Sequence, residues 1–152
     1  MRTDQREREA VRARTSEQER LRFLEAALAS SGEGVIMVDA EGRMAFINEA
    51  GRRMLQRQPP PQILIPQQAQ ALGLRYLNGR PVPPEDTPLA RALAGESMTE
   101  LPLLIAGPGG RDLCISNTVR PIWGAEGEII GAVSSFHDVT EQRRAEESLR
   151  QA

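Results

Sequence analysis

The stretch "RPIWGAEGEIIGAVSSFHDVTEQRRAEESLR", residues 120–150, joins two apolar, strand-like segments to the start of a charged helix. The turn GAEG separates the two segments, as in an antiparallel hairpin. After them, Asp138 can accept hydrogen bonds from the free N–H groups that begin a helix, and Glu141 follows as in a capping box. Thr140 offers a second hydroxyl at the same place. We therefore predict that the last strand of a sheet leads directly into a helix over 140–152.

The C-terminal half contains three strand candidates. RDLCISNTVRPIW (111–123) and EIIGAVSSFHD (128–138) form the hairpin described above, and SMTELPLLIA (97–106) precedes them across the turn GPGG. Their lengths and the turns between them favour an antiparallel meander.

The N-terminal half adds a hairpin and two short helices. GVIMVD (34–39) and RMAFIN (43–48) are β-branched and apolar segments on either side of the turn AEG. Asn48 can cap a helix over EAGRRMLQR (49–57), and TPLARALAG (87–95) begins with its own threonine cap and ends on glycine. These patterns predict one helix on each side of the middle of the chain.

The middle itself is rich in proline. Residues 58–84 hold seven prolines and two glycines, which favours irregular structure with at most a turn or two of helix around PQQAQAL (66–72). In chain order the elements predict an α+β fold, with a five-stranded antiparallel sheet and helices gathered on one side of it.

The N-terminal region predicts a long helix. Residues 1–22 carry seven arginines and five acidic residues without Gly or Pro, and Leu21, Leu24 and Leu28 then follow at heptad spacing. An apolar stripe of this kind suits packing against another helix, as in a coiled coil. The chain then divides into an N-terminal helix (1–30), a central domain (31–139) and a C-terminal helix (140–152).

Composition narrows the class of partner. With 19 basic and 21 acidic residues the net charge is -2, which disfavours nucleic acid or an anionic membrane as a partner. No apolar run is long enough to cross a bilayer, and the N-terminus has no signal-peptide pattern. The single cysteine allows no internal disulfide, which agrees with a reducing compartment. We expect a cytoplasmic protein.

The order of these elements and three local motifs resemble the PAS domain family. The motifs are GVIMVDAEGRMAFINEAGRRML (34–55), PEDTPLARALAGE (84–96) and the stretch 120–150, in which DVTE is the most specific part. Together with the helix end before them they cover about residues 24–150 in the correct order.

The resemblance implies a sensory or protein-interaction module that lies upstream of a histidine kinase, a diguanylate cyclase or a similar output domain. It implies dimerisation through the N-terminal helix and coupling of the sheet to the outgoing helix through Asp138 and Thr140. Two alternatives stay open: a ligand-free scaffold that recruits another protein, and a redox or light sensor that holds a noncovalent flavin on Trp123.

The cofactors of related domains find little support in the sequence. Haem-binding relatives supply an axial histidine from the helical middle, and residues 49–96 contain no histidine; His137 reads as a surface residue near a strand end. Photoadduct relatives carry a cysteine in an Asn-Cys-Arg-Phe-Leu-Gln stretch that is missing here. Cys114 fits a small buried thiol in a strand instead. Haem and covalent flavin are thus disfavoured.

In this fold a pocket commonly lies between the sheet and the middle helices. Its expected walls are mostly aliphatic, which favours a small apolar ligand or a short acyl chain over a planar ring system. The alternative is a filled core that binds nothing. The expected lining residues are Ile36, Val38, Phe46, Met54, Leu89, Leu93, Cys114, Ser116, Ala132 and Ser134.

Catalysis finds no support in the motifs. The sequence contains no recognisable Ser/His/Asp spacing, no phosphate-binding Gly loop followed by Lys, and no cluster of metal ligands. We expect a sensor module rather than an enzyme.

Overall fold

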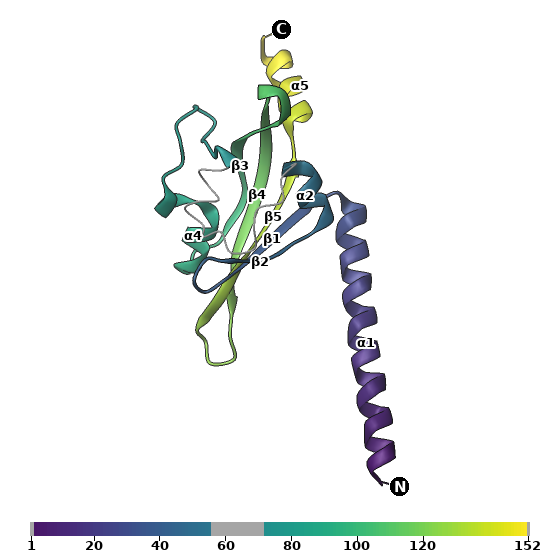
Figure 1. Cartoon of the computed structure of the whole chain (residues 1–152). Coiled ribbons are helices and arrows are strands. Elements are labelled where there is room, and N and C mark those ends of the chain that lie inside the picture. The colour runs from purple at the N-terminus through teal and green to yellow at the C-terminus, as the bar shows by residue number, and fades with distance from the viewer. Residues whose placement is uncertain (1, 56–71, 152) are drawn as a thin grey trace.

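The structure, a computed structural model, describes residues 2–55 and 72–151. Within these residues the chain forms a five-stranded antiparallel sheet in the order β2-β1-β5-β4-β3 (Figure 1). The strands are β1 (Gly34–Asp39), β2 (Met44–Ile47), β3 (Met98–Ala106), β4 (Asp112–Trp123) and β5 (Ile129–Asp138). The predicted five-stranded sheet is confirmed.

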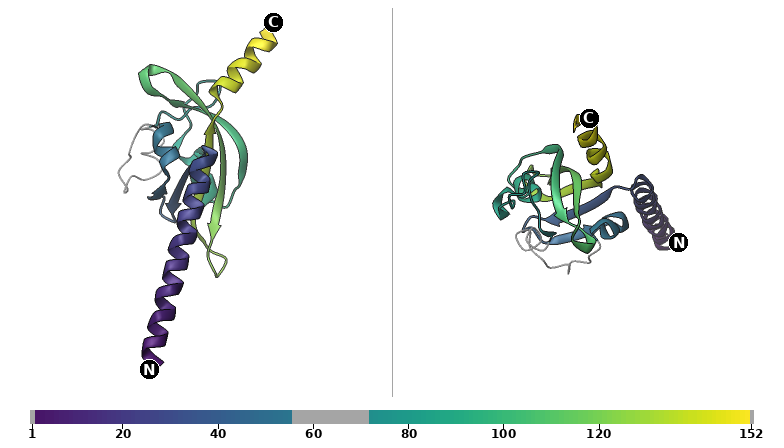
Figure 2. Two further views of the ribbon diagram at one scale, coloured as in Figure 1. Left: turned by 90° about the vertical axis from the view of Figure 1, so that its right-hand side faces the viewer. Right: turned by 90° about the horizontal axis from the view of Figure 1, so that it is seen from above.

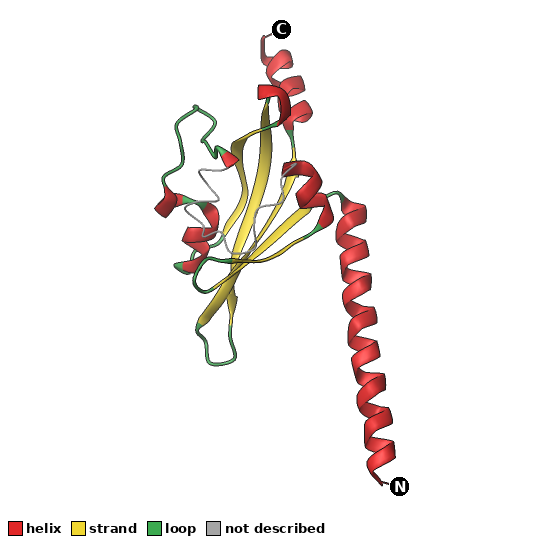
Figure 3. Ribbon diagram, in the orientation of Figure 1, coloured by secondary structure: helices red, strands yellow, loops and turns green. Residues whose placement is uncertain are grey.

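Helices flank the sheet in chain order (Figure 3). They are α1 (Arg2–Ser31), α2 (Glu49–Leu55), α4 (Pro88–Leu93) and α5 (Thr140–Gln151), with short 3₁₀ turns at Pro84–Asp86 and Pro108–Gly110. Helix α2 packs on β1, and α4 packs on β4 and β5. The predicted α+β class is confirmed. The helical turns predicted around 66–72 lie almost entirely outside the described residues.

Strand register decides which side chains face the helices. Ser134 of β5 pairs with Ile36 of β1 and with Val119 of β4, so these three side chains point to the same face of the sheet. We call it the inner face, because α2 and α4 cover it. Val119, Leu103 and Ala132 on this face are 0% exposed and form the centre of the core.

Asn48 ties the start of α2 to the start of the sheet. Its Oδ1 accepts hydrogen bonds from Gly51 N (2.8 Å) and Val35 N (2.9 Å), and its Nδ2 donates to Glu33 O (2.9 Å). The side chain is only 6% exposed, so each of these bonds replaces one that water would otherwise make. The predicted cap of α2 is therefore present, and it also fastens the segment that follows α1.

Helices α1 and α5 leave the domain in opposite directions (Figure 2). Helix α1 contacts the domain mainly through α2 and β1, and α5 contacts it mainly through β4. Most of α1 is exposed, including Leu21 (59%) and Phe23 (77%). None of the helices in the described residues combines the length and the apolar character that crossing a membrane requires.

Candidate ligand cavity and helix junction

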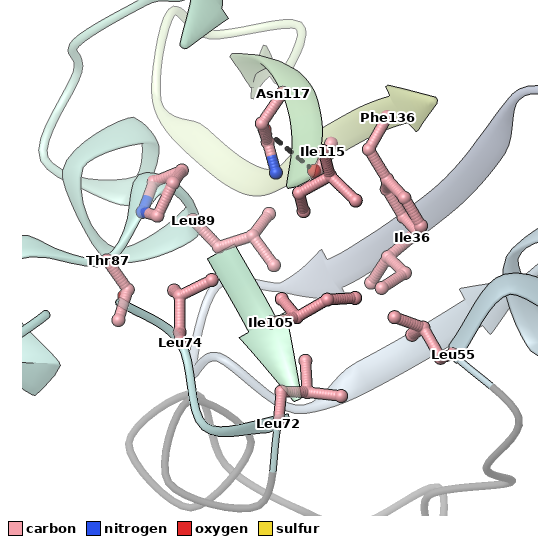
Figure 4. A pocket seen from close by; sticks show the side chains of 12 residues that line it. Ile36, Leu55, Leu72, Leu74, Thr87, Leu89, Ile105, Ile115, Asn117 and Phe136 are labelled. Carbon is pink, nitrogen blue, oxygen red and sulfur yellow. Dashed lines mark hydrogen bonds between the residues drawn. The ribbon is translucent and has the colours of Figure 1, made fainter. Parts of the chain in front are cut away.

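A cavity of about 60 Å³ lies between the inner face and the helices that cover it (Figure 4). Its walls are mainly aliphatic. The strands contribute Ile36, Ile105, Ile115, Asn117, Ser134 and Phe136. The helices and the loop before them contribute Leu55, Leu72, Leu74, Thr87, Pro88 and Leu89.

Among the described lining residues three side chains are polar, and in two of them the hydroxyl hydrogen is donated within the protein. The Thr87 hydroxyl donates to Pro84 O (3.1 Å) and accepts from Ala90 N (3.3 Å), as the cap of α4. The Ser134 hydroxyl donates to Asn117 Oδ1 (3.0 Å) in a buried hydrogen bond. The Nδ2 atom of Asn117 points into the cavity (Figure 4), and the hydrogen bonds among the described residues include none from it.

The structure brings part of the predicted pocket together. Ile36, Leu89 and Ser134 line the cavity. Val38 and Ala132 lie on the same sheet face and belong to the buried core beside it.

Strand β4 presents the other set of side chains to the cavity. Ile115 and Asn117 line it, whereas the structure places the predicted Cys114 and Ser116 on the opposite face. The reason is the register, in which Asn117, not Ser116, lies opposite Phe136. The prediction named the other set because the register was unknown, although the apolar Leu113, Ile115 and Val119 alternate with mostly polar residues and mark the inner face.

The remaining predicted pocket residues lie outside the cavity. Phe46 pairs with Met37 on the outer face of the sheet and borders a groove between α1 and α2. Met54 and Leu93 are partly buried and pack against the core without lining the cavity. In α2 the neighbouring residue Leu55 lines it instead, because one residue turns a helix by about 100°.

The sequence prediction missed the strip of chain before α4. Leu72 and Leu74 line the cavity from a segment in which Arg75 bridges to Leu104 of β3. The alternation of leucine in LGL, residues 72–74, is a signal for an extended segment, but the surrounding prolines conceal it. Ile105, which is 1% exposed, was missed for the same reason as Asn117: its strand register was unknown.

The junction between β5 and α5 is held to β4 by hydrogen bonds on both sides of Cys114. Val139 N donates to Cys114 O (2.9 Å), and Cys114 N donates to Thr140 Oγ1 (2.9 Å). Asp138 Oδ1 accepts from Thr140 N (2.9 Å) and from the Thr140 hydroxyl. The start of α5 is thus attached to β4 as well as to β5.

Glu141 takes no part in this network. Its side chain is exposed, and among residues 2–55 and 72–151 no hydrogen bond involves its carboxylate. Asp138 is the last residue of β5 and pairs with Ile115 of β4. The reciprocal bond of a capping box, which the sequence predicts, is therefore replaced by a turn in which Asp138 holds Thr140 alone.

Cys114 and His137 lie close to this junction. Cys114 is 5% exposed, and burial raises the pKa of its thiol, so it stays protonated at neutral pH. His137 Nδ1 lies 3.9 Å from Glu33 Oε1 at the surface. The described residues contain no group of three or more His, Cys, Asp or Glu side chains that could hold a metal ion.

Phe136 lies where the cavity meets the ends of α1 and α5 that join the domain. Its ring lines the cavity two residues before Asp138. It also packs against Gly34 so closely that a Cβ there would lie 2.6 Å from the ring. Gly34 begins β1 immediately after the turn that ends α1. A change in the position of this ring therefore affects both ends of the domain.

The predicted dimer residues lie in the C-terminal half of α1. Leu21 is 59% and Leu24 is 55% exposed, and Leu28, near the domain, is partly buried. An apolar stripe of this kind is available to a second helix. The dimer itself remains a prediction.

Several solved structures share this fold. A sensory box histidine kinase/response regulator from Burkholderia thailandensis superposes with a TM-score of 0.56 at 17% identity, covering 84% of this chain and 92% of that one. The PAS domain of an HTR-like protein from Haloarcula marismortui gives 0.59 at 18% identity, covering 84% and 98%. The PAS domain of a Colwellia psychrerythraea protein gives 0.56 at 16% identity, covering 80% and 98%.

At these identities the likeness establishes the fold. No curated protein matches the sequence. The family model for the PAS fold matches residues 28–144, from the end of α1 to the first turn and a half of α5. That range contains the whole sheet, the cavity and the helix junction, and so the chain belongs to the PAS family of sensor folds.

Proposed function

We propose that this chain is the sensory module of a signal-transduction protein. An occupant of the cavity shifts β4 and β5, and the shift reaches α5 through Asp138 and Thr140. The module then passes the signal to an output domain such as a histidine kinase or a diguanylate cyclase. It works as a cytoplasmic homodimer and has no catalytic activity of its own.

The observation that carries this proposal is that the cavity and the junction share two strands. On β4, the cavity residue Ile115 directly follows Cys114, whose backbone binds the start of α5. On β5, Phe136 lines the cavity two residues before Asp138. Core strands are close-packed, so a displacement at the cavity cannot be absorbed over so short a distance.

Modest energies suffice for such a signal. Shifting a two-state equilibrium between two arrangements of α5 needs only a few kcal/mol of difference in ligand affinity. Helix α5 projects away from the sheet, and none of its residues is buried. Few contacts therefore have to break when it moves.

The junction is tested by Asp138→Ala in a fusion that joins α5 in frame to a histidine kinase core. We expect the kinase activity of this variant to stop responding to the ligand or condition that changes it in the wild-type fusion. The circular dichroism and amide NMR spectra should remain those of a folded domain. Ser148→Ala, an exposed change on α5, is the control and should leave the response intact. An unchanged response in the Asp138 variant would remove the junction from the signalling path.

A ligand-free interaction module is the second candidate. The exposed apolar side chains of α1, including Phe23 at 77%, favour it because they offer a surface for another protein. A noncovalent flavin has weaker support: Trp123 is 58% exposed at the end of β4 and does not line the cavity. A colourless preparation that retains no flavin absorbance after incubation with flavin and removal of the unbound flavin would exclude the flavin.

A further inference from the structure

The amide of Asn117 has a polar end that faces the cavity, and no described residue accepts a hydrogen bond from it. The side chain is 8% exposed, and so is more than nine-tenths buried. Its orientation is set by Ser134, whose hydroxyl donates to Oδ1 (3.0 Å) and turns Nδ2 toward the cavity (Figure 4). No side-chain nitrogen or oxygen among the described residues is both fully buried and without a partner, so Nδ2 lies on the accessible wall of the cavity. An occupant that supplies an acceptor can therefore reach it.

Water competes for this site, because a water molecule can accept from Nδ2 and donate to a free lone pair of the Ser134 or Thr87 hydroxyl. The other described lining residues are apolar and offer water no further hydrogen bond. An occupant with one acceptor atom and an apolar remainder keeps the bond to Nδ2 and also covers the apolar walls.

The walls also select for a neutral molecule. The described lining residues include no Arg, Lys or His. A carboxylate in this cavity would lose its hydration without gaining a counter-charge, which is costly. A carbonyl oxygen keeps the acceptor and avoids that cost.

The volume limits the size of the occupant. At about 60 Å³ the cavity is well below the roughly 150 Å³ apolar cavity that admits benzene in another protein. Only a few non-hydrogen atoms fit without rearrangement of the walls.

We propose that the cavity binds a small, neutral aliphatic carbonyl compound, such as a short ketone or amide, whose oxygen accepts a hydrogen bond from Asn117 Nδ2. This inference rests on the proposed sensory function and names the ligand class for the same cavity. Ser134 acts as a positioning residue, because it fixes the direction of the amide.

Three probes of nearly equal shape, acetone, acetate and isobutene, test the ligand class. Acetone carries a neutral acceptor, acetate carries a charged one, and isobutene carries none. Each is titrated into the full chain, and binding is followed by the amide NMR spectrum, including the side-chain NH₂ signals of Asn117. We expect saturable shifts with acetone that include these NH₂ signals, at millimolar concentrations, as is usual for so few atoms. Isobutene should bind more weakly, and acetate should leave the cavity signals unchanged.

Variants assign the preference to the amide. Asn117→Leu should weaken acetone binding about tenfold and leave isobutene binding equal or stronger, because one hydrogen bond is lost and apolar area is gained. Ser134→Ala keeps the amide but frees its rotation, and should weaken acetone by a smaller factor. Ser135→Ala, the next residue on the other face of β5, is the matched control and should bind as the wild type does. If Asn117→Leu does not fold, Ser134→Ala against Ser135→Ala decides the question.

Binding of xenon under pressure, followed by the same NMR signals, shows whether the cavity admits any apolar ligand. It therefore distinguishes a wrong ligand class from a wrong sensory function. The ligand class is overturned if xenon enters the cavity but acetone fails to bind, binds no better than isobutene, or is insensitive to both Asn117→Leu and Ser134→Ala. It is equally overturned if acetate binds more tightly than acetone. If xenon also leaves the cavity signals unmoved, the cavity admits no ligand, and the proposed ligand-driven function falls as well.

Discussion

Single polar side chains fasten the helices to the sheet of this domain. Asn48 bonds three backbone groups at the entrance to β1, and Thr140 bonds the backbone of β4 at the exit from β5. Both sites lie where the chain changes from one kind of structure to another, so backbone groups there lack regular partners. Each side chain therefore contributes more to the stability of the fold than its size suggests.

The first prediction concerns Thr140→Val, which keeps the shape of the side chain and removes its hydroxyl. Cys114 N then loses its acceptor in a partly buried position, and we expect a loss of about 1–2 kcal/mol in the free energy of unfolding. Urea denaturation measures it. Thr118→Val is the control: Thr118 also accepts from a backbone group, Glu100 N, but at an exposed site where water can replace it. Equal losses would contradict the assigned role of Thr140.

The second prediction concerns Asn48→Ala. Two backbone donors and one acceptor lose their partner in a site that is 6% exposed, and we expect a destabilisation of about 3 kcal/mol. Asn48→Asp retains the acceptor for Val35 N and Gly51 N, and should cost less than Asn48→Ala. Urea denaturation of both variants checks the order. The reverse order would mean that the bond to Glu33 O dominates.

At the scale of single residues, the sequence predicted the roles of residues that bind groups nearby in the chain. It did not predict the roles of residues whose position depends on strand pairing. Asn48 and Asp138 could be identified as caps, because a cap and the N–H groups it binds are close in sequence. Asn117 could not be identified, because its position opposite Phe136 is set by strands far apart in the chain. Glu141 fitted a local pattern, but the backbone of Asp138 belongs to the β5 ladder.

Among the elements, the attachment of α5 to β4 is the contact most open to direct measurement. Cys114 lies beneath this attachment, and burial raises the pKa of its thiol while Arg143 and Asp138 act on it in opposite directions. A protonated and buried thiol reacts only when the structure opens locally. Its labelling rate therefore reports on the opening of the junction.

The third prediction is that Cys114 in the folded chain reacts slowly with a disulfide reagent, and that Thr140→Val accelerates the reaction several-fold. The variant weakens the bonds that keep the start of α5 on β4. Rates are followed by absorbance at constant pH, with denatured protein as the reference. Thr118→Val should react as slowly as the wild type. Equal acceleration in both variants would show that global unfolding exposes the thiol.

The fourth prediction uses the ion pair at the β3 edge of the sheet. The hydrogen bond from Arg75 lowers the pKa of Asp112 below its usual 3.8. A lowered folded-state pKa stabilises the fold above the unfolded-state pKa, and this contribution disappears as the pH falls through the folded-state value. Asp112→Asn should thus lower the melting temperature slightly at pH 7, by an amount that shrinks below about pH 3.8. Glu126→Gln, in the β4–β5 turn, is the control and should show no such dependence.

At the scale of elements the sequence predicted most of the fold, and the reasons are physical. Segments 34–39 and 128–138 are apolar runs that each border a glycine-containing turn on one side, and the structure has β1 and β5 within one residue of these limits. The wall formed by Leu72 and Leu74 escaped prediction, because the leucine alternation there is only three residues long and lies in a proline-rich stretch. The sequence therefore predicted the position of the cavity but only some of the residues that line it.

In the whole molecule, α1 is too long and too exposed to be explained by the domain alone. It runs for 30 residues, its contacts with the domain are concentrated near its end, and Asp4 to Arg8 (3.5 Å) is an exposed ion pair along it. Such pairs contribute only a few tenths of a kcal/mol each. A helix of this kind gains most of its stability from packing.

The fifth prediction is that the chain dimerises through this helix. Replacing Leu21, Leu24 and Leu28 with serine should give monomers in analytical ultracentrifugation and lower the helical signal in circular dichroism. Arg14→Ser with Glu17→Ser is the matched control, because these residues occupy the same heptad register without adding apolar area. A dimer that survives the leucine changes would place the interface elsewhere, and a monomeric wild type would remove it altogether.

The opposite directions of α1 and α5 have a consequence for any protein that carries this domain between two others. The rotation angle between the upstream and the downstream domain about the helix axes is then set by the number of residues in each helix. Adding one residue to α5 turns the downstream domain by about 100°, whereas adding seven returns it nearly to its original heading. Activity plotted against helix length would therefore be periodic, so that the length of this helix is as much a part of the signal as any side chain.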